Sequence, residues 1–196
     1  MFNMTTYLTE KTLGNILRSW AGDDNVKAES LVVGTRLRHD YEVKKDGITY
    51  VVEFNGDSHY RDANVIFRDW VKYELSTKIG KKVVQIPYFI QLNTETFKIF
   101  FDADFEIETT YPHGFVATKM LPSSFCPIGY ERALKDLEMM PSNVNKDVMD
   151  SLEIKANKLG NKWVYYTNHV DGMPWEEFVD KANVVHNNKY IYPHPL

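Results

Sequence analysis

Two neighbouring segments of the chain alternate between apolar and polar side chains. They are TRLRHDYEV over residues 35–43 and ITYVVEFNG over residues 48–56. An alternation of period two is typical of strands that bury one face. Asp46 and Gly47 lie between them, and Asp-Gly is a strong signal for a two-residue hairpin turn. The pattern therefore predicts an antiparallel β-hairpin.

The turn also predicts which side chains share a face of the hairpin. With a two-residue turn, Lys45 pairs with Ile48, and Asp40 then lies directly opposite Glu53. A four-residue loop keeps both carboxylates on one face, whereas a three-residue turn separates them. In the two-residue register the apolar face carries the following side chains: Leu37, His39, Tyr41, Val43, Tyr50, Val52 and Phe54.

Other segments show helical or strand patterns around this hairpin. A short helix is expected after its N-cap Thr9, ending near Gly22, and a longer one from about Asp62 to Ile79, closed by Gly80. Residues 81–92 are expected to form a buried strand whose pairing stops on one side at Pro87. Later expectations are a strand region over 98–110, helices over 127–140 and 145–160 separated by Pro141, a strand over 163–170 and a helix over 174–185.

The order of these elements predicts an α/β protein. Strand, strand, helix, strand is a mixed order that favours a mixed sheet flanked by helices. We expect residues 1–104 to form an α/β core and residues 105–196 to form a mostly helical C-terminal elaboration packed on it. This elaboration is the expected surface for a protein partner or a second copy of the chain.

Composition adds limits on location and partners. The formal net charge of −4 gives no overall basic footprint, so binding to nucleic acid would need a local basic face. One cysteine allows no internal disulfide, and the N-terminus lacks the features of a secretion signal. No segment has the apolar length of a membrane span. We expect an intracellular, cytoplasmic protein without membrane contact.

The predicted pairing of Asp40 and Glu53 indicates chemistry as well as structure. Two opposed carboxylates can bind one hard cation such as Mg²⁺ or Mn²⁺, with a carbonyl oxygen and waters completing its coordination. Such a cation orients water and neutralises charge on a phosphate. The alternative interpretation is two solvent-facing acids, paired with Arg38 or Lys72.

Further residues in the same order resemble a known family. The chain is similar to the EDxHD branch of the PD-(D/E)xK nuclease-like superfamily, which includes very-short-patch-repair endonucleases and phage-associated homing endonucleases. The resemblance covers residues 9–92, and the stretch VVEFNGDSHY is especially close to the pattern of an acidic strand that ends in Gly and is followed by His. The residues that carry it are Glu10, Asp40, Glu53, Asn55, Gly56, His59 and Asp69.

The resemblance implies a restriction-endonuclease-like fold and roles for these residues. Asp40 and Glu53 would bind metal, and His59 would act as general acid or base or orient water. Asp69 and Glu10 would complete the polar cluster. Asn55 stands where the wider superfamily usually has lysine or a similar polar residue, and an amide supplies no positive charge. The lysine role is therefore filled elsewhere or is missing.

The expected function is hydrolysis of DNA phosphodiester bonds by a metal-dependent endonuclease, encoded in a cell or a phage. The alternative is a nuclease-fold protein without catalysis that acts as a nucleic-acid-binding adaptor or a phage-type inhibitor. Phosphate contacts are expected from basic side chains near the carboxylates. The candidates for these contacts are Arg36, Arg38, Arg61, Lys72, Lys81 and Lys82.

Overall fold

A computed structural model describes residues 7–109, 111–115, 125–159, 169–170 and 173–174. The chain forms two compact units. The first unit comprises Met1–Asn55 and Val71–His113, and the second comprises Gly56–Trp70 and Gly114–Leu196. The predicted α/β class is confirmed by a four-stranded mixed sheet with flanking helices. The predicted boundary at residue 104 stays a prediction.

The first helix, α1, spans Glu10–Ala21 as the sequence predicts. The side chain of Thr9 accepts a hydrogen bond from the backbone N–H of Thr12, which satisfies an amide that the helix leaves unpaired. The helix ends at Gly22, whose φ of +90° suits a residue without a Cβ atom. Because Thr9 caps the helix, Glu10 is the first residue of α1.

The sheet of the first unit contains four strands in the order β1-β2-β3-β4. β2 (Arg38–Lys45) and β3 (Ile48–Asn55) form the predicted hairpin, and Lys45 pairs with Ile48. β4 (Lys82–Pro87) runs parallel to β3 and ends at Pro87. The sequence did not reveal β1 (Val26–Leu31), which pairs antiparallel with β2 and whose side chains are mostly exposed.

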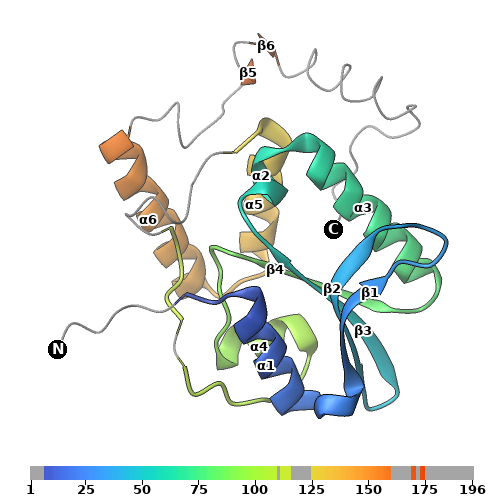
Figure 1. Ribbon diagram of the computed structural model, residues 1–196. Helices are drawn as coiled ribbons and strands as arrows, with labels where there is room; N and C mark the ends of the chain where they lie inside the picture. Colours follow the sequence, from blue (N-terminus) through green and yellow to red (C-terminus); the bar gives the residue numbers. More distant parts are fainter. Residues whose placement is uncertain (1–6, 110, 116–124, 160–168, 171–172, 175–196) are drawn as a thin grey trace. The chain divides into compact units, whose positions relative to one another are not determined.

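One face of this sheet is covered by α1 and by α4 (Thr94–Phe101), as Figure 1 shows. Trp20 of α1 contacts the rings of Tyr50 in β3 and of Phe97 and Phe101 in α4, with centroids 5.0–5.4 Å apart. Five of the side chains predicted for the apolar face of the hairpin lie in this core. These are Tyr41, Val43, Tyr50, Val52 and the partly buried Phe54.

The predicted strand over residues 98–110 is wrong. Residues Thr94–Phe101 form α4, and residues 102–109 belong to no strand. Asn93 caps the helix by accepting a hydrogen bond from the N–H of Thr96, 2.9 Å away. Phe97 and Phe101 lie one turn apart and stack at 4.4 Å on the core side. The cap and the helical spacing of these rings favour a helix more strongly than the run of aromatic residues favours a strand.

The helix predicted from about Asp62 to Ile79 is confirmed, and a short helix that the sequence did not reveal precedes it. α2 spans Ser58–Arg61, and α3 spans Ala63–Lys78. Asp62 between them is extended, and its side chain accepts a hydrogen bond from the N–H of Asn64 at 2.8 Å. His59 therefore lies in a short helix rather than in the predicted loop. Gly80 has the expected positive φ of +77°.

In the second unit, α5 (Pro127–Glu138) and α6 (Ser142–Leu159) confirm the two helices predicted on either side of Pro141. Ile66 of α3 packs with Cys126 and Ile128 at the start of α5. Of the predicted strand over 163–170, the structure describes His169–Val170 (β5), which pairs with Met173–Pro174 (β6). The predicted helix over 174–185 lies outside the described residues, apart from Pro174.

Among the residues that the structure describes, every helix is too short or too polar to cross a bilayer.

Candidate functional site

Glu53 is the buried centre of a polar cluster in the first unit. Its carboxylate is 3% exposed, and Lys72 of α3 donates a hydrogen bond of 2.6 Å to Oε2. Oε1 lies 2.5 Å from Nδ1 of His39. Because an ionised carboxylate only accepts hydrogen bonds, Nδ1 carries the proton. The interpretation of Glu53 as a solvent-facing acid is therefore wrong, although its pairing with Lys72 is confirmed.

His39 does not lie where strand alternation predicts. It was expected on the apolar face beside Tyr41, but its ring is buried between Glu53 and Ser76. Nε2 of His39 lies within hydrogen-bond distance of the Ser76 hydroxyl, 2.8 Å away. The paired residues of β2 and β3 end at Tyr41 and Val52, so alternation does not continue unchanged past this point.

Asp40 lies at this end of the ladder. Its Oδ2 accepts a hydrogen bond of 2.7 Å from the backbone N–H of Phe54, the residue after Glu53. Burial raises the pKa of Asp40 to about 6, and the negative charge of Glu53 contributes to the rise. Lys72 lowers this pKa, but by less. The two predicted carboxylates are therefore near enough to repel each other.

Glu10 is brought to the same region by the start of α1. The hydroxyl of Tyr41 donates a hydrogen bond of 3.0 Å to the backbone oxygen of Glu10. The Glu10 side chain is exposed, and its charge adds a smaller rise to the pKa of Asp40. Three of the predicted site residues thus contribute negative charge to one region of the first unit.

Asn55 ends β3 with a fully buried side chain. Among the residues that the structure describes, neither amide atom of Asn55 has a hydrogen-bond partner. An unsatisfied buried amide costs about 1–3 kcal/mol, so such groups usually bind water or an ion. Asn55 therefore offers an oxygen near the end of the strand that carries Glu53.

Oxygen atoms of the kind that hard divalent cations prefer occur in this region. Asp40 carries a carboxylate whose charge is unfavourable without a cation, and Glu53 and Asn55 supply further oxygen atoms. In the described part of the chain, no three His, Cys, Asp or Glu side chains form a metal-binding group. A cation here would need waters and non-carboxylate oxygens, which is how proteins commonly bind Mg²⁺.

The second unit contains a separate buried cluster around Asp69. Nδ1 of His59 lies 2.6 Å from Oδ2 of Asp69, and the same oxygen accepts a hydrogen bond of 2.8 Å from Arg132. Burial alone would raise the pKa of Asp69, but His59 and Arg132 outweigh it and hold this pKa below its ordinary range. The ion pair between Asp69 and Arg132 was not predicted from the sequence.

Arg132 belongs to α5, within the predicted C-terminal elaboration of residues 105–196. Its guanidinium is 1% exposed and lies over the ring of Tyr60, 5.1 Å from the ring centroid. The Tyr60 hydroxyl donates a hydrogen bond of 2.7 Å to Asp136, whose pKa burial raises to about 6. No local motif indicates the contacts of Arg132 with His59 and Asp69, which lie more than sixty positions away.

The predicted phosphate contacts occupy several different environments. Arg36 is exposed, and Arg38 is exposed but donates a hydrogen bond of 2.8 Å to the backbone oxygen of Glu29. Arg61, in the second unit, pairs with Asp57 at 3.2 Å. The ammonium groups of the three lysines contact Glu53 (Lys72), Glu42 (Lys81) and the backbone oxygen of Phe101 (Lys82).

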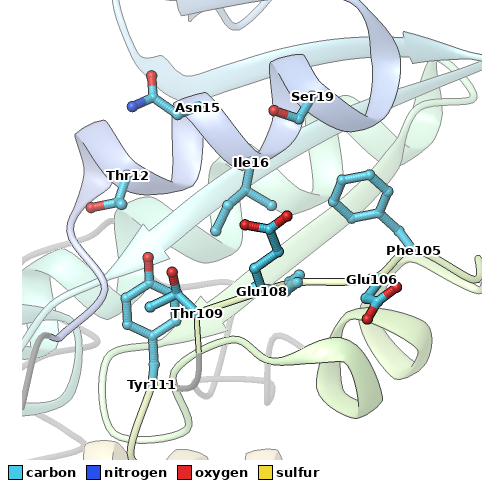
Figure 2. Close-up of a pocket in the computed structure, with 10 residues that line it drawn as sticks. Thr12, Asn15, Ile16, Ser19, Phe105, Glu106, Glu108, Thr109 and Tyr111 are labelled. Atoms are coloured by element: carbon cyan, nitrogen blue, oxygen red, sulfur yellow. The ribbon is translucent and has the colours of Figure 1, made fainter.

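A groove in the first unit lies between α1 and residues 105–111 (Figure 2). Ile16 and Phe105 supply apolar side chains, and the carboxylate of Glu108 lies between them in this view. None of the predicted site residues lines this groove. It is therefore separate from the cluster around Glu53.

Comparison with known proteins gives no family for this chain. No family model, no curated protein and no solved structure matches it. Its function must therefore be inferred from the two clusters themselves.

The ion pair of Glu53 leads to a prediction about stability. Replacing Glu53 with glutamine should lower the free energy of unfolding by about 3 kcal/mol, because the buried ion pair between Glu53 and Lys72 is broken. Urea unfolding without metal measures this loss. The matched control is Glu42→Gln, whose partner Lys81 is more exposed, with an expected loss below about 1 kcal/mol. Equal losses for the two variants would contradict this assignment.

Proposed function

We propose that this chain is a metal-dependent nuclease that hydrolyses DNA phosphodiester bonds as an endonuclease. The observation that carries the proposal is the coupling of Asp40 and Glu53 beside the buried ammonium of Lys72. Two carboxylates can bind a hard cation, and a cationic side chain beside them can attract a phosphate. The nuclease resemblance assigned the same two carboxylates to metal.

In this proposal Asp40 and Glu53 hold Mg²⁺ or Mn²⁺. The bound cation would neutralise charge on the phosphate and favour ionisation of a water. Glu53 keeps lone pairs for it, because each carboxylate oxygen can accept more than the single hydrogen bond that it receives here. Asp40 becomes more acidic when a cation offsets its repulsion by Glu53.

Lys72 supplies the positive charge that Asn55 lacks. Its ammonium lies 2.6 Å from Glu53 and 3.3 Å from the backbone oxygen of Arg38, so its position is held from two sides. A buried ammonium next to the proposed metal ligands can orient Glu53 and attract a phosphate oxygen. We therefore assign Lys72 to the catalytic cluster rather than to an exposed phosphate-binding surface.

The arrangement of elements also supports the finer fold assignment, restriction-endonuclease-like. Glu10 begins a helix, Asp40 and Glu53 lie on a hairpin, and His59 and Asp69 precede a strand parallel to β3. This is the order that the resemblance to EDxHD nucleases implies. The acid–base role of His59 and the part of Asp69 stay predictions from that resemblance.

A second candidate function has an observation in its favour. Both oxygens of Glu53 already have protein partners, and Asn55 replaces the lysine usual in the superfamily. A Glu53 carboxylate that is already bonded to His39 and Lys72 is compatible with a nuclease fold that binds DNA without cleaving it. The candidate is an adaptor or a phage-type inhibitor.

Cleavage assays separate the two candidates. The purified full chain is incubated with supercoiled, linear and single-stranded DNA and with RNA, in Mg²⁺, Mn²⁺ or EDTA. We expect metal-dependent nicking or linearisation of supercoiled DNA, lost in EDTA and in Asp40→Ala but retained in Asp24→Ala, which changes an exposed acid. No cleavage of any substrate, or undiminished cleavage by Asp40→Ala, contradicts the nuclease proposal. DNA binding without cleavage supports the adaptor.

A further inference from the structure

Helix α5 contributes a charged side chain to the interior of the second unit. Arg132 and Asp69 are each 1% exposed, and Nη1 of Arg132 lies 2.8 Å from Oδ2 of Asp69. A buried charge of this kind persists only when it is paired, so each residue depends on the other. The ring of Tyr60 and the nearby Asp136 provide further compensation for the guanidinium.

The same guanidinium nitrogen also holds His59 directly. Nη1 of Arg132 lies 3.2 Å from the backbone oxygen of His59, while Asp69 contacts the ring of His59 at Nδ1. Arg132 is thus bonded both to the backbone of the histidine and to the carboxylate that orients its ring. Two attachments restrict the position and the rotation of His59 more than either does alone.

This geometry determines which nitrogen of His59 carries the proton. His59 and Arg132 keep Asp69 ionised, and an ionised carboxylate accepts the Nδ1 proton of the ring. In the neutral ring, Nε2 is then left with the lone pair. The His59 side chain is 21% exposed, so part of the ring reaches solvent although its partners are buried.

We propose that Arg132 is a positioning residue that keeps His59 in the Nδ1–H form, with Nε2 as the nitrogen that exchanges protons. This inference deepens the proposed nuclease function and rests on it, because the resemblance gives His59 its acid–base role. It also assigns a use to residues 105–196: α5 orients a histidine that lies more than seventy positions earlier in the chain.

Nitrogen-15 NMR of the His59 ring tests the proposal independently of cleavage. At alkaline pH, where the ring is neutral, the full wild-type chain should show the Nδ1–H tautomer. Arg132→Met should give a mixture of tautomers, Arg132→Lys should restore the wild-type spectrum, and Arg68→Met, which changes an exposed arginine on α3, should leave it unchanged. In the cleavage assay, Arg132→Met should lower kcat by about 10- to 100-fold, with KM nearly unchanged.

Two results would overturn the inference: an Nε2–H tautomer in the wild-type protein, or a wild-type spectrum in folded Arg132→Met. If that variant does not fold, the wild-type tautomer and Arg132→Lys decide, because lysine can still donate to both Asp69 and the His59 backbone oxygen. A wild-type protein that cleaves nothing removes the nuclease function, whereas its tautomer spectrum still decides the role of Arg132.

Discussion

Replacing Asp40 with asparagine should lower metal-dependent cleavage of DNA by about 10³-fold or more, yet should stabilise the metal-free fold. Activity falls because a neutral amide binds a hard cation far more weakly than a carboxylate does. Stability rises because the charge of Asp40 is disfavoured by burial and by Glu53. The asparagine oxygen can still accept the hydrogen bond from the N–H of Phe54.

The size of the stability change depends on pH. Asp40 has a pKa of about 6 in the folded chain, above the ordinary value of about 4 for an aspartate. A raised pKa means that the folded form binds the proton more tightly, so stability from Asp40 is lost as pH rises from about 4 through about 6. The free energy of unfolding of Asp40→Asn should match that of the wild type near pH 4 and exceed it by about 2–3 kcal/mol at pH 8.

Urea unfolding at pH 4 and pH 8 without metal, together with cleavage rates in Mg²⁺, measures both effects. Asp24→Asn, which changes an exposed acid in the same unit, should alter neither quantity. A variant that is both less stable and less active at pH 8 would instead indicate that Asp40 has a structural role. Full activity in Asp40→Asn would remove it from the metal site.

Replacing Gly129 with alanine should destabilise the second unit by about 4 kcal/mol or more, an exceptionally large effect for one methyl group. A Cβ atom at this position would lie 1.7 Å from the backbone oxygen of Tyr60 and 2.4 Å from its carbonyl carbon. These are backbone atoms, which cannot rotate away as a side chain can. The N–H of Cys126 also bonds this Tyr60 oxygen at 3.0 Å, so α5 and α2 would have to separate.

Thermal and urea unfolding of Gly129→Ala measure this loss, with Gly56→Ala as the matched control. A Cβ atom at Gly56 meets no atom within 4 Å, and the φ of Gly56 is not positive. The control should therefore retain stability close to that of the wild type. Unchanged stability in Gly129→Ala would show that α5 does not pack closely against α2.

The sequence was most informative where the determinants of structure are local. Asp46 and Gly47 specify the hairpin turn, both with positive φ, and the turn then determines the pairing of Lys45 with Ile48. Thr9 likewise marks the start of α1 through its own capping bond. Because the hairpin register follows from the turn, Asp40 and Glu53 could be predicted to lie near each other.

The remaining features depend on contacts between distant residues. His39 could not be placed from alternation, because its partners Glu53 and Ser76 come from another strand and from α3. Helical spacing predicts a polar stripe of Asp62, Asp69, Lys72 and Ser76. In the structure Asp62 is exposed, whereas the other three side chains are buried. Such a stripe gives no indication of burial until its partners are known.

The most direct test of the proposed site is to locate a divalent ion in crystals of the wild-type protein grown with Mn²⁺, by anomalous scattering. The account predicts one Mn²⁺ bound by carboxylate oxygens of Asp40 and Glu53, and its loss in Asp40→Ala. A wild-type structure in which Mn²⁺ binds elsewhere, while Glu53 retains only His39 and Lys72 as partners, would contradict the account.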